Sequence, residues 1–168
     1  MTAPATVVRF HQEGQTATFK VDGRATMHQS TPVRRQAEAS LAAGILRINV
    51  DLRDCLYMDS TFLGTLLFLN KQLGERQGRF SLIAPSSACV KLLRQMGLDD
   101  YLLEHEDAVS PTGGWSELPA GGHDGPSMRR TVEEAHQELA GLPGEAGAQF
   151  EEVMRCLNRA TPPAKPEG

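Results

Sequence analysis

The sequence is poor in cysteine and aromatic residues, and it has no long hydrophobic run. Its three cysteines, Cys55, Cys89 and Cys156, are widely separated and form no Cys-x-x-Cys pair. This spacing argues against a disulfide framework and a zinc site, so we expect free thiols. The sequence has no stretch of 18 apolar residues and no apolar segment near its start. These absences predict a soluble, cytoplasmic protein without a membrane partner.

Neither sign of charge dominates the composition. The chain has 17 basic and 21 acidic residues. Residues 1–109 contain 12 of each kind, whereas residues 110–168 contain 5 basic and 9 acidic residues, so the excess is confined to the C-terminal part. A neutral domain with an acidic extension fits protein partners better than the phosphate backbone of a nucleic acid. We therefore expect no nucleic-acid partner.

The signatures of common enzyme and metal sites are also missing. The glycines form neither a P-loop nor a Gly-x-Gly-x-x-Gly motif, and no Gly-x-Ser-x-Gly elbow surrounds Ser60. The histidines lack the i, i+4 pair of a zinc-binding helix. We expect a non-enzymatic protein without metal or cofactor. The five histidines are His11, His28, His105, His123 and His136.

The composition divides the chain into four parts. We expect a folded domain over 1–109, a Gly/Pro/Ser-rich linker over 110–127, a helical extension over 128–160 and a disordered tail over 161–168. The extension should contain two amphipathic helices, Met128–Leu142 and Ala146–Asn158. Val132, Ala135 and Leu139 form the apolar stripe of the first. Because such helices are marginal alone in water, they should dock on the domain, pair with a second chain or fold on a partner.

The order of elements in the first domain predicts its fold class. Two strands form a hairpin, and helices and strands then alternate. This order predicts an α/β fold in which a mixed sheet is flanked by helices. The first helix should open at Ser30-Thr31-Pro32, with Pro32 at its first position. The expected strands are Thr6–Gln12, Thr16–Asp22, Ile48–Leu52 and Arg79–Ala84, and the other helices begin near Ser60 and Ala88.

The most informative stretch is Ile48–Gln77, which predicts a buried strand, a short acidic turn and a long apolar helix. Asp59 and Ser60 stand immediately before the apolar run that begins at Phe62. Small oxygen-bearing side chains are typical of a helix start, where a negative charge is also favoured. The helix is more apolar than one buried stripe requires. We therefore expect exposed hydrophobic side chains around its start, as at an interaction surface.

The segment Met58–Gly64, MDSTFLG, resembles the phosphorylation motif of anti-sigma factor antagonists, the STAS domain family. In that family the usual pattern is Asp-Ser-Ser/Thr-Gly, followed by an aliphatic residue and Gly. Phe62 stands where the family usually has glycine, a departure that bears on the fit of a partner. The resemblance covers roughly residues 6–106 and implies a STAS-like mixed sheet of four to five strands with about four helices, mainly on one side. The matching positions are Asp59, Ser60, Thr61, Leu63 and Gly64.

The resemblance implies a regulatory protein that acts by partner switching. The unphosphorylated form would bind a serine kinase that acts as an anti-sigma factor, and so release a sigma factor. The kinase would then phosphorylate Ser60 and break the complex, and a protein serine phosphatase would restore it. Thr61 is a weaker alternative phosphoacceptor. The residues expected to contact the partner are Met58, Asp59, Ser60, Thr61, Phe62 and Leu63.

Each of these interpretations has a structural alternative. Ser60 and Asp59 can be ordinary helix caps, and Met58, Phe62 and Leu63 can be core residues. The whole protein can also be a scaffold or accessory STAS subunit of a larger assembly, associating with itself through its C-terminal helices. In that case the hydroxyl of Ser60 would not be phosphorylated.

Overall fold

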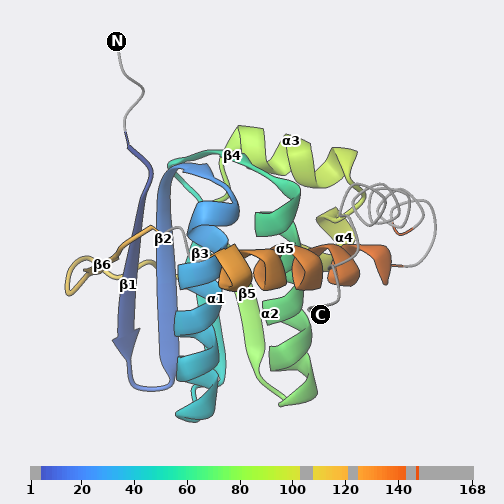
Figure 1. The fold of residues 1–168 in the computed structure, drawn as a ribbon. Helices are drawn as coiled ribbons and strands as arrows, with labels where there is room; N and C mark the ends of the chain where they lie inside the picture. The colour runs from blue at the N-terminus through green and yellow to red at the C-terminus, as the bar shows by residue number, and fades with distance from the viewer. Residues whose placement is uncertain (1–4, 103–107, 121–124, 143–146, 148–168) are drawn as a thin grey trace.

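Six strands form a mixed sheet in the computed structural model, which describes residues 5–102, 108–120, 125–142 and 147 (Figure 1). Five strands follow the order β5-β3-β2-β1-β6, and β4 pairs with β2. The β1–β2 hairpin and the β1–β6 pair are antiparallel, whereas the other pairs are parallel. The strands are β1 (Val7–Glu13), β2 (Thr16–Ala25), β3 (Arg47–Asp51), β4 (Cys55–Met58), β5 (Arg79–Ile83) and β6 (Ser116–Leu118).

The long strand β2 organises the sheet because it pairs with two strands in succession on one side. Residues 16–20 pair with β3, and residues 23–25 pair with β4. Gly23 lies where the register shifts, with a φ of 105° that suits glycine. Ala17, Phe19 and Val21 of β2 are fully buried and form the centre of the core.

The helices build two layers over one face of the sheet. Helices α1 and α2 lie against the strands, and α5 crosses over both of them (Figure 1). Helix α3 packs against β4, and the short α4 contacts α2 and α3. The helices are α1 (Met27–Ala42), α2 (Ser60–Glu75), α3 (Ser87–Gln95), α4 (Asp99–Leu102) and α5 (Gly125–Ala140).

The predicted fold class is confirmed, but two strands were missed. The turn predicted after β3 contains β4, in which Cys55 and Met58 are buried while Leu56 and Tyr57 are exposed. Strand β6 lies within residues 110–127, for which the composition predicted a linker. Both strands are short and lack a clear alternation of apolar and polar residues. Only the pairing of β4 with β2 and of β6 with β1 identifies them.

Helix α1 begins one turn earlier than predicted. Thr26 caps it and forms a capping box with Gln29, whose side chain accepts from the amide of Thr26 at 2.9 Å. Pro32 is therefore the sixth helical residue and not the first. A proline at this position cannot donate to the carbonyl of His28, so it weakens the helix that it was predicted to open.

The two cysteines of the described part are free, as predicted, and both are buried. The thiol of Cys89 in α3 donates to the carbonyl oxygen of Cys55 in β4 at 3.5 Å, so the two cysteines are neighbours. Interaction between the two thiols lowers the pKa of Cys89 to about 7 and, together with burial, raises the pKa of Cys55. Cys156 lies outside the described residues, as do the predicted helix Ala146–Asn158, apart from Gly147, and the tail 161–168.

The position of Pro32 leads to a first prediction. Pro32→Ala should raise the free energy of unfolding by about 1–3 kcal/mol, because alanine restores the missing hydrogen bond and removes the contact of the ring with the previous turn. Urea unfolding followed by circular dichroism measures the change. Pro85→Ala, outside the helices, is the control and should instead lower stability by about 0.4–1 kcal/mol through the unfolded chain. A Pro32→Ala protein less stable than the wild type would contradict this account of α1.

Candidate functional site

The carboxylate of Asp59 caps two helices at once. Asp59 is the N-cap of α2, and its Oδ1 accepts from the amide of Phe62 at 2.8 Å. Its Oδ2 accepts from the amide of Met27, the first residue of α1, at 2.9 Å. The amide of Asp59 in turn donates to the carbonyl of Ala25 in β2. A negative charge between two helix N-termini is favoured by both dipoles, so Asp59 holds the starts of α1 and α2 together.

Ser60 is the first residue of α2, not its cap, and its hydroxyl contacts the C-terminal extension. Its Oγ lies 2.9 Å from Nε2 of His136 in α5. Nδ1 of His136 lies 2.7 Å from the carbonyl oxygen of Val132, which can only accept, so Nδ1 carries a hydrogen. In the neutral ring Nε2 is then the acceptor, and the hydroxyl of Ser60 donates to it. The half-buried Ser60 is thus held by a helix 76 residues away in the sequence.

Helix α5 approaches α2 most closely at Gly64, one turn after Ser60. A Cβ atom at Gly64 would lie 2.2 Å from the carbonyl oxygen of Ala135. Only a glycine permits two backbones to come this close. Ala135 and Leu139, from the predicted apolar stripe of the extension, are fully buried, and Val132 is half-buried. Of the three fates expected for this helix, docking on its own domain is the one observed.

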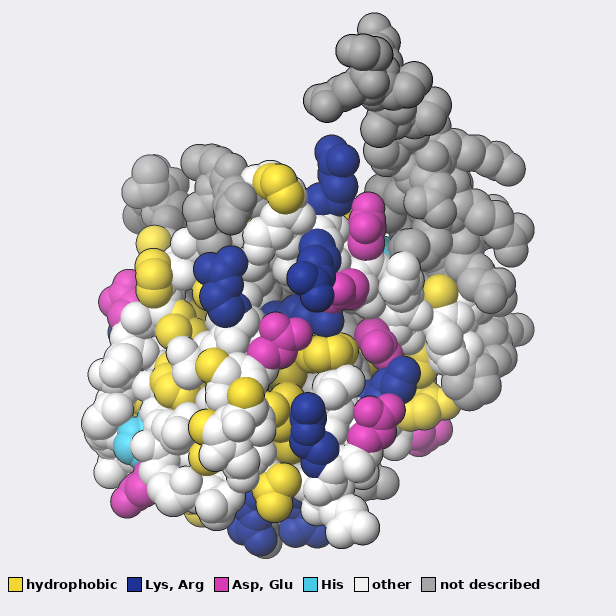
Figure 2. All heavy atoms as spheres, turned by 60° about the horizontal axis from the view of Figure 1, so that its bottom comes forward, with side chains coloured by type: hydrophobic (Ala, Val, Ile, Leu, Met, Phe, Trp, Pro, Cys, Tyr) yellow, Lys and Arg dark blue, Asp and Glu magenta, His cyan; other side chains and the backbone are white. Residues whose placement is uncertain are grey.

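Charged side chains join α5 to α1 and α2. The guanidinium of Arg34 lies 3.8 Å from the ring centroid of Phe68 and is paired with Glu38 and Glu134. Arg34 is only 8% exposed, so this cation of α1 links three helices. Lys71 of α2 and Glu138 of α5 form a further pair at 3.8 Å. On the face drawn in Figure 2, basic and acidic side chains are correspondingly interspersed.

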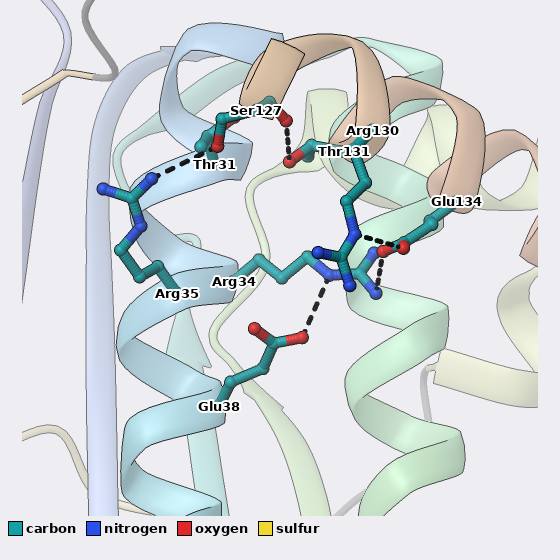
Figure 3. A pocket seen from close by; sticks show the side chains of 8 residues that line it. All are labelled: Thr31, Arg34, Arg35, Glu38, Ser127, Arg130, Thr131 and Glu134. Carbon is teal, nitrogen blue, oxygen red and sulfur yellow. Dashed lines mark hydrogen bonds and ion pairs between the residues drawn. The ribbon is translucent and has the colours of Figure 1, made fainter. Parts of the chain in front are cut away.

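A pocket of about 200 Å³ lies in the seam between α1 and α5. Figure 3 shows the guanidinium groups of Arg34 and Arg130 converging on the carboxylate of Glu134 at this pocket. Two buried atoms, Oγ1 of Thr31 and Nη1 of Arg34, find no hydrogen-bond partner among the described residues. Each such atom costs about 1–3 kcal/mol, so the seam with α1 is less well satisfied than the contact with α2. The lining residues are Thr31, Arg34, Arg35, Glu38, Ser127, Arg130, Thr131 and Glu134.

The prediction of exposed hydrophobic side chains at the start of α2 is wrong. Met58, Thr61, Phe62 and Leu63, four of the six residues predicted to contact a partner, are buried. The helix is apolar on more than one side because the sheet covers one side and α5 contacts another. Of the predicted contact residues, Asp59 and Ser60 remain partly exposed.

Large apolar side chains are exposed nearby instead, on β4 and at the start of α1. Leu56, Tyr57 and Met27 are 64%, 40% and 38% exposed. They lie around Asp59, which follows β4 and binds the amide of Met27. The guanidinium carbon of Arg24 lies over the ring of Tyr57, 4.3 Å from its centroid. Because successive side chains of a strand point to opposite faces, Leu56 and Tyr57 expose apolar area on different sides of β4.

Sequence reasoning missed His136 and Arg34. His136 was considered only as a metal ligand, although it lies within the apolar stripe of α5, and its neighbours Ala135 and Leu139 were the available signal. Nothing in the sequence distinguishes Arg34 from an ordinary arginine on the protein surface. Among the described residues, no His, Cys, Asp or Glu cluster could hold a metal ion, and no helix is long and apolar enough to cross a membrane. His105 and His123 lie outside the described residues.

The part of the chain that matches a known family contains strands β1 to β5 and helices α1 to α4. The family described as "Mlab, STAS domain" matches residues 8–104. The chain belongs to the STAS domain family. The match ends before β6 and α5, so the helix that covers Ser60 lies beyond the part of the chain that matches the STAS domain.

Solved STAS structures show the same fold at low identity. The unphosphorylated anti-sigma factor antagonist SpoIIAA is 19% identical, with a TM-score of 0.53 over 60% of this chain and 89% of that one. The phosphorylated Bacillus SpoIIAA is 20% identical, with a TM-score of 0.50 over 60% and 92%. An anti-sigma factor antagonist from Mycobacterium paratuberculosis is 20% identical, with a TM-score of 0.51 over 61% and 87%. No curated protein matches the sequence.

The double cap provides the prediction from this site. Asp59→Ala should lower the free energy of unfolding by about 2 kcal/mol, because two helices lose their cap. Asp59→Asn should cost roughly half as much, since its one amide oxygen replaces only one of the two acceptors. Asp54→Ala is the control: the exposed carboxylate of Asp54 pairs with Lys20 at 3.7 Å, and its backbone bond to Gly23 is unaffected by the change, so stability should change by less than about 0.5 kcal/mol. Equal urea midpoints for Asp59→Ala and Asp54→Ala would rule out the double cap.

Proposed function

We propose that the protein is a cytoplasmic anti-sigma factor antagonist that regulates transcription by binding an anti-sigma serine kinase, and that phosphorylation of Ser60 ends this binding. The observation that carries the proposal is the position of the Ser60 hydroxyl, at the N-terminus of α2 and directly after the capping Asp59. The residue is partly exposed, and the exposed Met27 donates through its amide to the carboxylate of the neighbouring Asp59. A hydroxyl acceptor thus lies near an exposed apolar residue that a protein partner can cover.

The chemistry of a phosphoserine suits this position. Phosphorylation adds nearly two negative charges and three acceptor oxygens, and a helix N-terminus tolerates both. The new charge would stand beside the carboxylate of Asp59, which already uses the amides of Phe62 and Met27. The fold can therefore remain intact while the charge of the contact surface changes. A partner that accepts the neutral hydroxyl would be repelled by the phosphate.

Ser60 is a better phosphoacceptor than Thr61. Thr61 is only 4% exposed and lies inside the first turn of α2. A kinase must bring the γ-phosphate of ATP to the accepting oxygen, which requires the side chain at the surface. The partly exposed Ser60 meets this requirement once the contact with His136 is opened.

The proposal requires no enzymatic activity of this chain. Ser60 and His136 form a hydroxyl–imidazole pair, as in hydrolases, but the other nitrogen of His136 binds a backbone carbonyl, not a carboxylate. The kinase supplies ATP and the catalytic groups, and a protein serine phosphatase removes the phosphate. The antagonist itself would only present the serine.

An accessory role in a larger assembly is the second candidate. It is favoured by the cover that α5 places over Ser60. In that role the STAS domain would bind its partner constitutively. The apolar stripe of α5 is not free for self-association, because Ala135 and Leu139 are buried in their own chain. Self-association would need a different surface.

Phosphorylation assays on the full chain test the first candidate. When the protein is incubated with ATP and candidate anti-sigma kinases, mass spectrometry should find one phosphate on Ser60, and none on Ser60→Ala. Ser87→Ala is the matched control, because Ser87 is an exposed serine at the first position of α3. Ser60→Asp should weaken binding of the same kinase at least tenfold by titration calorimetry. Phosphate on a different residue, or unchanged affinity of Ser60→Asp, would favour the accessory role.

A further inference from the structure

We propose that α5 competes with the kinase for the face of α1 and α2 around Ser60. Helix α5 occupies this face and must leave before Ser60 is phosphorylated. This inference rests on the proposed function and adds a regulatory helix to it. It also indicates which kind of segment the kinase presents, because the side chains of α5 show which kind of helix this face can bind. We infer that the kinase presents an amphipathic helix of the same kind.

The contact between α5 and α2 directly blocks the acceptor oxygen. The hydroxyl of Ser60 donates to Nε2 of His136 at 2.9 Å. In phosphoryl transfer, Oγ forms a bond to the γ-phosphorus of ATP, ADP leaves and the hydroxyl proton passes to a base of the kinase. The proton that must leave is held in the hydrogen bond to His136, so this bond has to open before the transfer. The rate of phosphorylation should therefore follow the fraction of molecules in which α5 is displaced.

The features of α5 define the helix that the face can accept. A small residue is required opposite Gly64, where the backbone of Ala135 now lies. An apolar residue one turn later fills the place of Leu139, which is fully buried. Acidic residues reach Arg34 and Lys71, as Glu134 and Glu138 do in α5. The expected partner segment is thus an acidic amphipathic helix with a small residue at its centre.

Several observations indicate that α5 can leave without loss of the fold beneath it. The match to the STAS family ends at residue 104, and α5 begins at Gly125. Ala135 and Leu139 are its fully buried apolar side chains, whereas α2 buries most of its length in the core. The seam with α1 contains the pocket described above and the unpaired atoms of Thr31 and Arg34. The partly exposed ion pair between Lys71 and Glu138, which joins α5 to α2, is weakened by salt.

Gly64 permits a first test by hydrogen exchange on the full chain. Gly64→Ala should displace α5, because the new Cβ would meet the backbone of Ala135, while alanine favours the helical state of α2 itself. Gly74→Ala is the matched control in the same helix, since a Cβ there meets nothing within 4 Å. Exchange of the α5 amides should rise at least tenfold in Gly64→Ala and stay at the wild-type level in Gly74→Ala. Equal protection of α5 in all three proteins would overturn the proposal.

A second test asks whether the face accepts a helix from outside. Ala135→Asp buries an unpaired charge against α2 and should release α5, whereas Gln137→Asp changes an exposed position of the same helix. The probe is a fluorescent peptide with the sequence of residues 125–142. It should bind the Ala135→Asp chain at least tenfold more tightly than the wild-type or Gln137→Asp chain. A peptide with Glu134→Lys and Glu138→Lys should lose this binding, and equal binding to all chains would contradict a shared face.

A kinase assay separates this inference from the proposed function. With a kinase that phosphorylates Ser60, the initial rate should be at least tenfold higher for Ala135→Asp than for Gln137→Asp. Equal rates, with α5 shown to be displaced by exchange, would overturn the competitor role and leave Ser60 as the phosphorylation site. Absence of phosphate in every variant, including those with α5 displaced, would instead overturn the proposed function and the inference with it.

Discussion

The structure depends on the fact that α2 is apolar on more than one side. A helix with one apolar stripe needs a single neighbour, but α2 must be covered by the sheet and by a second layer. Helix α5 contributes that layer, with its backbone against Gly64 and its buried Leu139 nearby. The hydrophobic effect therefore favours the docking of α5, a segment outside the matched STAS domain, because it completes the burial of α2.

This second layer changes the chemistry of Ser60. At the start of α2 the hydroxyl lies at the positive end of a helix, a position suited to a phosphate. With α5 docked, the same hydroxyl is the donor of a hydrogen bond to His136. Under the proposed function, this one oxygen would have two incompatible uses, and the position of α5 would decide between them. A helix that completes the burial of α2 would in this way also control a site.

Electrostatics give the contact between the layers its specificity. Arg34 is nearly buried between three helices, so its charge is acceptable only with the ring of Phe68 and the carboxylates of Glu38 and Glu134 around it. Displacement of α5 removes one of these carboxylates and exposes the cation. A partner with acidic side chains restores the pairing, whereas an apolar partner does not. The charge pattern therefore favours exchange of one acidic helix for another.

Much of the fold and part of the site could be predicted from local sequence. Alternation and turn residues determined the β1–β2 hairpin, and the strand, Asp-Ser pair and apolar run determined the β3–α2 region, including the cap and the candidate phosphoacceptor. These features could be predicted from the sequence because each depends on residues a few positions apart. The STAS motif at Asp59–Gly64 added the fold class for the same reason.

Tertiary structure alone decided the partners of those residues. Strands β4 and β6 exist through pairing with β2 and β1, and the second hydrogen bond of Asp59 reaches the amide of Met27, 32 residues away. The contact of Ser60 with His136 and the close approach of the two backbones at Gly64 require α5 to fold back over α2. Local pattern records how apolar a helix is, but not which distant segment covers it, because the hydrophobic effect rewards burial by any neighbour of suitable shape.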